Sequence, residues 1–331
     1  MSPQRVSMIG GGSWATALVK VLNDNQCEVD WWMRREKNIS YLELHHHNPN
    51  YIRSISFSPA LIHPSNDLQS VFSKNEIVIL AVPSAFLQSV TSKLTPEHFK
   101  NKLIISAIKG MIPEENLLIA EFLKTHFGAD EKNLVNISGP SHAEEVAQEK
   151  LSYLTMACVH EANAKRACEL FACKYIRCTP SDDVYGTEYS AVLKNIYAIT
   201  AGIFNGLGYG DNFHAVLVSN CIEEMERFLK TVHPITRDIK DSAYLGDLLV
   251  TAYSQFSRNR TLGTMIGKGY SVPNALLEMD MVAEGYFAAK SVHEVNKNYG
   301  VNIPIAEATY RILYEGAGAS DELELVTRLL S

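Results

Sequence analysis

The chain has 331 residues, about twice the length of a typical single domain, so its length predicts two domains. A hydrophobic fraction of 46% and a charged fraction of 20% are ordinary for globular proteins and exclude a largely disordered chain. The formal net charge of -7, without any basic block, excludes a general nucleic-acid binder but leaves room for a small anionic ligand held by local Arg and Lys.

Short apolar runs alternate with helix-forming segments through the first half of the chain. Runs of this length, rich in Val and Ile, are typical of buried parallel strands in strand–helix–strand units. The predicted strands are Val6–Ile9, Glu28–Trp32, Ile77–Val82, Leu103–Ala107, Leu134–Ile137 and Leu154–Val159. The pattern predicts an α/β, Rossmann-like doubly wound sheet over residues 1–183.

The character of the chain changes after Asp183, where long amphipathic stretches replace the β-branched clusters. Two of these stretches, Phe213–Val232 and Glu284–Tyr299, have the helical period. Gly, Pro and Asn predict breaks at Gly206–Asp211, Arg258–Gly263 and Gly300–Pro304. We therefore expect an all-α C-terminal domain over residues 184–331, which would bind the substrate and carry the catalytic groups.

A glycine-rich turn follows the first predicted strand. Gly10-Gly11-Gly12-Ser13-Trp14-Ala15 fits the G-x-G-x-x-A pattern of dinucleotide-binding folds. Gly10 would permit the tight turn, Gly12 would let the backbone approach a pyrophosphate, and Ala15 would allow close helix packing, while the helix N-terminus supplies N–H groups. The alternative is a glycine turn that serves packing alone.

The tip of the second predicted strand bears on the choice of coenzyme. NAD-specific sites usually place Asp or Glu there to hold the ribose hydroxyls, whereas this chain has Arg34 and Arg35. Guanidinium groups suit a 2′-phosphate or stack on adenine. The sequence thus predicts that NADP(H) is accepted besides NAD(H) and leaves the preference open. Solvated surface arginines are the alternative.

Two further segments lie where predicted strands end, at Ser106–Gly110 and Ser138–Ala143. Ligands of open α/β sheets bind outside the carboxyl ends of the strands, so Lys109 is placed to meet a cofactor or a substrate. A lysine that is merely exposed at the end of a strand is the alternative.

Charged residues interrupt two apolar helical segments of the second domain. Lys194 lies in the apolar segment Tyr189–Ala198, and Asp247 lies in a second one. A buried ammonium needs a partner, and a desolvated lysine beside a carboxylate suits proton transfer, although a lysine that reaches the surface is the alternative. Arg258 and Asn259, which follow Ser257, provide a guanidinium fork and an amide for a phosphate.

The remaining patterns predict no metal and no membrane span. The six cysteines lack the spacing of zinc ligands, and the consecutive His45, His46 and His47 cannot all face one ion on regular backbone. No stretch reaches the roughly 20 apolar residues that a membrane span requires. We expect reduced thiols and a cytoplasmic protein.

Taken in order, these motifs resemble bacterial-type NAD(P)-dependent glycerol-3-phosphate dehydrogenase over almost the whole chain. The matching segments are Gly10–Ala15, Lys109-Gly110, Ile137–Ser141, Ala191–Asn195, Gly246–Leu248, Ser257–Arg260 and Glu284–Tyr286. The resemblance implies reversible NAD(P)H-dependent reduction of dihydroxyacetone phosphate to sn-glycerol 3-phosphate, which feeds glycerophospholipid synthesis, and a homodimer is compatible with it. One departure is Ile108, where relatives often carry Thr.

The motifs and the resemblance together predict the site residues. The catalytic residues would be Lys194, which exchanges the proton, with Asp247 and Lys109 beside it. The cofactor would contact Gly10, Gly12, Ser13, Trp14, Arg34, Arg35, Lys109, Ala143, Arg258, Val282 and Glu284. The small phosphate substrate would contact Lys109, Gly139, Ser141, Lys194, Asp247, Ser257, Arg258 and Asn259.

Two other functions compete with this hypothesis. Dehydrogenases of the 3-hydroxyacid type carry the pattern K-x-x-x-N around the catalytic lysine. In this chain the fourth residue after Lys194 is Ala198, and the asparagine, Asn195, is directly adjacent to the lysine instead. A non-catalytic dinucleotide sensor would keep the glycine turn, yet it has no need for Lys194, Asp247 and Arg258 together.

Overall fold

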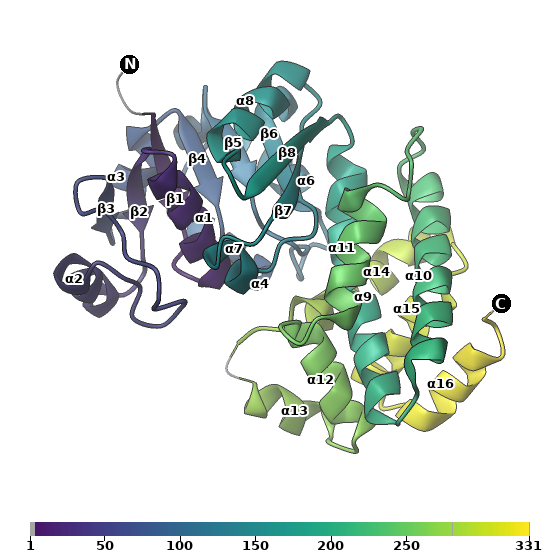
Figure 1. Ribbon diagram of the computed structural model, residues 1–331. Coiled ribbons are helices and arrows are strands. Elements are labelled where there is room, and N and C mark those ends of the chain that lie inside the picture. The colour runs from purple at the N-terminus through teal and green to yellow at the C-terminus, as the bar shows by residue number, and fades with distance from the viewer. Residues whose placement is uncertain (1–3, 280, 331) are drawn as a thin grey trace. The chain divides into compact units, whose positions relative to one another are not determined.

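The computed structural model describes residues 4–279 and 281–330, and their contacts separate two compact units. Unit 1 contains the chain up to Ile108 together with Ile119–Val184; unit 2 contains Lys109–Leu118 and the chain from Tyr185 onward. Figure 1 draws the strands of unit 1 in purple to teal and the last helices of unit 2 in yellow. The sequence predicts one domain boundary, after residue 183, whereas the structure also assigns Lys109–Leu118 to the helical unit. The reason is that Met111 and Leu118 are buried in the core of that unit.

Unit 1 is built on one eight-stranded sheet with the order β3-β2-β1-β4-β5-β6-β7-β8. All neighbouring strands are parallel except β6 and β7. The strands are β1 (Arg5–Ile9), β2 (Glu28–Trp32), β3 (Ile62–Ser65), β4 (Ile77–Leu80), β5 (Leu103–Ser106), β6 (Leu134–Ser138), β7 (Ser152–Ala157) and β8 (Ile176–Ser181). The chain order reverses between β1 and β4, as in doubly wound sheets, so the predicted fold class is confirmed.

The six predicted strands correspond to β1, β2, β4, β5, β6 and β7, whereas the two edge strands β3 and β8 were not predicted. Each edge strand has a single buried residue, Ile62 in β3 and Ile176 in β8, and each contains a proline. An edge strand is covered on fewer sides and tolerates proline, so the apolar pattern that predicts a central strand is missing there.

Helices of unit 1 connect the strands and bury their apolar sides against the sheet. They are α1 (Ser13–Asp24), α2 (Glu36–His45), α3 (Leu68–Lys74), α4 (Ser84–Thr91), α5 (Pro96–Phe99), α6 (Ile119–Phe127), α7 (Ala143–Ala147) and α8 (Glu161–Phe171), with a 3₁₀ turn, η1 (Glu131–Asn133). The helix α1 is buried along most of its length, with Ala15 and Leu18 fully inside, so it lies in the centre of the unit.

Unit 2 is helical, as the sequence predicts. Its elements are α9 (Val184–Gly206), α10 (Asp211–Val232), η2 (Ser242–Gly246), α11 (Asp247–Tyr253), α12 (Arg258–Gly267), α13 (Val272–Glu278), α14 (Glu284–Tyr299), α15 (Pro304–Tyr310), η3 (Arg311–Glu315) and α16 (Ala319–Thr327). The elements η2 and η3 are π-helical turns. Within the described ranges, no helix is long and apolar enough to cross a membrane.

The predicted break at Arg258–Gly263 is wrong, whereas the other two predicted breaks are confirmed. Arg258–Gly263 lies inside α12, whose N-terminus is capped by the Ser257 hydroxyl. Gly263 serves the crossing of α12 with α9, since a Cβ at this position would collide with the backbone of Ile199 and Ile203. This glycine therefore allows two helices to approach closely and does not end one.

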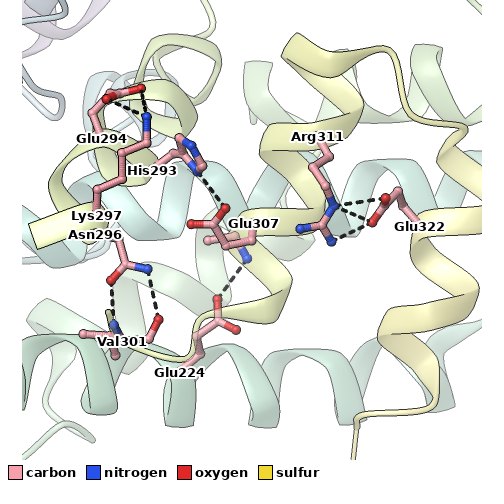
Figure 2. A network of polar contacts seen from close by, with 10 residues as sticks. Glu224, His293, Glu294, Asn296, Lys297, Val301, Glu307, Arg311 and Glu322 are labelled. Carbon is pink, nitrogen blue, oxygen red and sulfur yellow. Dashed lines mark hydrogen bonds and ion pairs between the residues drawn. The ribbon is translucent and has the colours of Figure 1, made fainter. Parts of the chain in front are cut away.

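A buried carboxylate of α10 holds the start of α15 (Figure 2). Glu224 accepts hydrogen bonds from the backbone N–H groups of Ile305 at 2.8 Å and Ala306 at 2.9 Å. These N–H groups have no partner within their own helix because they lie in its first turn. Burial raises the pKa of Glu224 to about 7, and the two N–H groups oppose this shift. Glu224 therefore acts as the cap that α15 lacks.

Replacing Glu224 by Gln should destabilise the protein, because one of the two N–H groups then faces an amide nitrogen instead of an acceptor. We expect the free energy of unfolding to fall by about 1–3 kcal/mol, measured by urea titration. The control is Glu226→Gln on the same helix, whose carboxylate forms an i,i+4 pair with Lys230 at the surface and should change stability by less than ~0.5 kcal/mol. Equal stabilities of the two variants would contradict the capping role.

Candidate functional site

Three charged side chains meet inside unit 2. The Nζ atom of Lys194 lies 2.5 Å from Oδ1 of Asp247, and the Nζ atom of Lys109 lies 3.3 Å from Oδ2 of the same carboxylate. Lys194 is 4% exposed and Asp247 is 1% exposed, while Lys109 is only partly buried. Asp247 therefore pairs with both ammonium groups at once. The structure brings the three predicted catalytic residues together and shows that Lys194 does not reach the surface.

The environment shifts the proton affinities of this cluster. Burial lowers the pKa of Lys194 to about 7, with the attraction of Asp247 working against this shift and the repulsion of Lys109 adding to it. Burial alone would raise the pKa of Asp247, but the Lys109 and Lys194 ammonium groups outweigh it and hold that pKa below its ordinary value. Lys194 can thus exchange a proton near neutral pH beside a carboxylate that stays ionised.

The local structure positions the Lys194 and Asp247 side chains. Lys194 extends from the apolar helix α9, where Leu193 and Ile196 are fully buried. Asp247 begins α11 immediately after the π-helical turn η2, and the Thr251 hydroxyl donates to its carbonyl oxygen at 2.6 Å. Single π-helical turns often occur at functional sites, because they redirect one side chain without ending the helix.

A chain of buried amides connects Lys109 with three helices, α9, α12 and α14. Asn195 donates to the carbonyl oxygen of Lys109 at 2.9 Å, and Asn259 donates to the side-chain oxygen of Asn195 at 2.9 Å. The backbone N–H of Gly285 then donates to the side-chain oxygen of Asn259, again at 2.9 Å. In the sequence, Asn195 is recognisable only as the neighbour of Lys194, and no pattern indicates that its side chain connects Lys109 with α12.

The predicted anion-binding segment lies at the start of α12. Ser257 caps the helix by accepting from the backbone N–H of Arg260, and Arg258 donates to the carbonyl oxygen of Val282 at 3.2 Å. Glu284 begins α14, two residues after Val282. Arg258 thus lies beside one predicted cofactor contact, Val282, while its neighbour Asn259 belongs to the amide chain.

The glycine turn of unit 1 has the geometry that its sequence predicts. Gly10 adopts φ +127°, and the Trp31 indole nitrogen donates to its carbonyl oxygen at 2.6 Å. Gly12 precedes α1, and a Cβ there would point into open space among the described residues. No described side chain caps this helix, and its first turn contains no acidic residue. The α1 N-terminus therefore fits a pyrophosphate.

Asn48 braces this turn, although sequence reasoning missed it. Its side chain is 1% exposed and donates to the Gly11 carbonyl oxygen at 3.2 Å and to the Thr16 hydroxyl at 2.9 Å. The residue follows three consecutive histidines, the first of which, His45, ends α2. The adjacent Pro49 and Asn50 favour a turn, but no sequence pattern indicates which groups the turn contacts.

The remaining predicted residues of unit 1 follow strands whose carboxyl ends share one edge of the sheet. Ser13 and Trp14 begin α1 after β1, and Ala143 begins α7 after β6. Arg34 and Arg35 follow β2 and are exposed. After β6, Gly139 adopts φ +101° and its carbonyl oxygen accepts from the Ser141 hydroxyl at 2.9 Å.

Models of one protein family match both parts of the chain. The N-terminal model of NAD-dependent glycerol-3-phosphate dehydrogenase matches residues 5–164, and the C-terminal model matches residues 183–324. Glycerol-3-phosphate dehydrogenase [NAD(P)+] of Limosilactobacillus reuteri (strain DSM 20016) is 34% identical over 317 residues, covering 95% of this chain and 94% of the relative. The enzyme of the same name from Bacillus subtilis (strain 168) is 34% identical over 324 residues, covering 97% and 93%.

The fold shows the same relationship. The crystal structure of glycerol-3-phosphate dehydrogenase from Coxiella burnetii matches with a TM-score of 0.92 and 26% identity, covering 98% of this chain and 99% of that one. The similarity in sequence and the similarity in structure both extend over nearly the whole chain. This chain therefore belongs to the NAD-dependent glycerol-3-phosphate dehydrogenase family.

Proposed function

We propose that the chain catalyses the reversible, NAD(P)H-dependent reduction of dihydroxyacetone phosphate to sn-glycerol 3-phosphate, which supplies glycerophospholipid synthesis. The observation that carries the proposal is the buried pair of Lys194 and Asp247 with Lys109 beside it. A lysine whose pKa is lowered to about 7 is suited to give a proton to an alkoxide and to take one back. Family membership supports the same reaction.

The nicotinamide cofactor, when bound, supplies the hydride that reduces C2 of the ketone. The glycine turn supports its binding, because the α1 N-terminus offers N–H groups and a positive dipole to the pyrophosphate. Arg34 and Arg35 would contact the adenine side, where exposed guanidinium groups suit a 2′-phosphate. The further residues assigned to the cofactor are Gly10, Gly12, Ser13, Trp14, Lys109, Ala143, Arg258, Val282 and Glu284.

In the reductive direction, Lys194 donates its proton to the oxygen that develops negative charge at C2. Asp247 holds the ammonium in place, and Lys109 adds a second positive charge. These charges interact more strongly with an alkoxide than with a neutral ketone, and this difference between the two states lowers the barrier. In the oxidative direction, the neutral Lys194 amine accepts the proton of the secondary hydroxyl.

The substrate phosphate and hydroxyl groups are assigned to the substrate contacts that the sequence predicts. Arg258 is partly exposed, and its guanidinium provides the planar donors that suit a phosphate. Ser257 and Asn259 flank it in sequence and would contact the same substrate. The other proposed substrate contacts are Lys109, Gly139, Ser141, Lys194 and Asp247.

Two finer proposals concern the molecule as a whole. We propose that the protein is a homodimer, on the basis of the family resemblance. We also propose a cytoplasmic location, because the cysteine pattern predicts reduced thiols. Light scattering of the purified protein would give the mass of the assembly, and a monomer mass would contradict the dimer.

Turnover with dihydroxyacetone phosphate, followed by nicotinamide absorbance with NADPH and with NADH, tests the proposed reaction. We expect oxidation of the cofactor that depends on the substrate. A protein that binds the cofactor but never turns over would overturn the proposal.

Replacing both Arg34 and Arg35 by Ser should raise the KM for NADPH about tenfold or more, because a charge-assisted contact to a phosphate contributes about 1.5–3 kcal/mol. The KM for NADH serves as the control and should change much less.

Lys194→Ala should lower kcat by about a hundredfold or more, because it removes the proton donor. In the wild type, the reductive rate should fall as the pH rises through about 7, where Lys194 loses its proton, and the oxidative rate should rise over the same range. The control is Lys297→Ala, which removes an exposed lysine of α14 and should leave both profiles unchanged. Near-wild-type turnover of the Lys194 variant would rule out its catalytic role.

Arg258→Ala should raise the KM for dihydroxyacetone phosphate about tenfold to a hundredfold, since a charge-assisted hydrogen bond to phosphate is lost. Arg328, which directly follows α16, is exposed and pairs with Glu324, and Arg328→Ala provides a matched control of the same unit. Steady-state kinetics of both variants would measure the effect. An unchanged KM in the Arg258 variant would remove this residue from the phosphate site.

A further inference from the structure

Asn48 is a buried polar residue that takes no part in the proposed reaction, although its side chain is 1% exposed and fully hydrogen-bonded. Its amide nitrogen donates to the Gly11 carbonyl oxygen at 3.2 Å and to the Thr16 hydroxyl at 2.9 Å. Its amide oxygen accepts from the backbone N–H groups of Asn50 at 3.0 Å and Tyr51 at 3.3 Å. Because those N–H groups can only donate and a carbonyl oxygen can only accept, the orientation of the amide is fixed.

Side chains hold three consecutive carbonyl oxygens of the glycine turn. The contacts are Trp31 Nε1 with Gly10 at 2.6 Å, Asn48 Nδ2 with Gly11 at 3.2 Å, and Thr16 Oγ1 with Gly12 at 2.8 Å. The Thr16 hydroxyl donates to Gly12 and accepts from Asn48, so Asn48 orients this hydroxyl as well. Two of the three contacts therefore depend on Asn48.

Holding a carbonyl oxygen also directs the N–H group that follows it, because the two point in opposite directions in a trans peptide. The contact at Gly11 therefore directs the N–H of Gly12, and the contact at Gly12 directs the N–H of Ser13. Both N–H groups lie at the start of α1, where the helix offers no acceptor of its own and an anion can bind.

This turn needs such a brace because the peptide between Gly11 and Gly12 joins two residues without a Cβ. Glycine allows rotations that other residues resist, so little in the backbone itself prevents this peptide from turning over. A Cβ at Gly12 would meet no described atom within 4 Å, so packing does not hold the peptide on that side either. If the peptide turned over, a carbonyl oxygen would face the pyrophosphate in place of an N–H group and would repel it.

We propose that Asn48 is a positioning residue of the dinucleotide site, which holds the backbone N–H groups of the glycine turn in the orientation that binds a pyrophosphate. The inference rests on the proposed nicotinamide cofactor and concerns its affinity. Since NADPH and NADH share the pyrophosphate, loss of Asn48 weakens both alike, whereas loss of Arg34 and Arg35 acts mainly on NADPH. Proton transfer by Lys194 does not involve Asn48.

The test is the dissociation constant of NADPH and of NADH, measured by isothermal titration calorimetry without substrate. Asn48→Ala frees the peptide between Gly11 and Gly12, and we expect both constants to rise about tenfold. In turnover, the KM for each cofactor should rise by a similar factor. The kcat at saturating cofactor and the KM for dihydroxyacetone phosphate should stay within about twofold of the wild type.

Asn25→Ala provides a matched control at the opposite end of α1. The Asn25 side chain follows this helix, and its amide donates to the carbonyl oxygens of Leu170 at 3.0 Å and Ala172 at 3.1 Å. Like Asn48→Ala, this variant removes two hydrogen bonds of an amide nitrogen, so its unfolding temperature should also fall. Both dissociation constants should remain those of the wild type.

Thr16→Val is a milder variant that tests the same brace if Asn48→Ala is too unstable to purify. It keeps the shape of a fully buried side chain and removes the hydroxyl between Asn48 and Gly12. We expect both dissociation constants to rise about threefold or more. In the double variant the rise should be smaller than the product of the two single effects, since both residues act in one hydrogen-bond network.

Wild-type dissociation constants in Asn48→Ala and Thr16→Val would overturn the positioning role. A rise for NADPH alone would also overturn it, because the effect would then come from the 2′-phosphate. An equal rise in Asn25→Ala would do the same, because it would show a general loosening of α1. A wild-type protein that binds neither cofactor would overturn the cofactor assignment itself, and this failure is recognised before any residue is changed.

Discussion

The pairing of the buried Asp247 carboxylate with two ammonium groups is the interaction on which the arrangement of this cluster depends. An uncompensated charge in the interior costs several kcal/mol, so the buried Lys194 could not be held there in its charged form without this carboxylate. The amide chain from Lys109 through Asn195 to Asn259 then joins this ion cluster to α12 and α14. Charge pairing and helix packing thus constrain each other.

A second ammonium group, that of Lys109, lies beside the pair of Lys194 and Asp247. Lys194 holds its proton less firmly than an ordinary lysine, since burial and the second ammonium act in the same direction. Both ammonium groups would interact more strongly with an oxygen that develops negative charge than with a neutral ketone. This difference is the physical reason for the catalytic roles proposed for Lys194 and Lys109.

Sequence patterns predicted the parts of this structure that depend on local composition and periodicity. Six strands and the glycine turn were found because buried strands are rich in Val and Ile and because a close turn needs glycine. The edge strands β3 and β8 were missed, since an exposed edge does not require the apolar pattern. Gly263 was interpreted as a helix break although it enables a crossing. Asn48 and Asn195 act through partners distant in sequence, and a single sequence contains no record of such pairing.

The segment Lys109–Leu118 belongs to unit 2, although in the sequence it lies between two segments of unit 1. This arrangement has a consequence for synthesis of the chain, because these residues leave the ribosome long before the helices with which they pack. During translation, Met111 and Leu118 must therefore stay without their core until the residues beyond Tyr185 have emerged. While the sheet forms, the segment between its strands stays exposed until the later helices bury it. For the same reason, cutting the chain at one position cannot separate the two units intact.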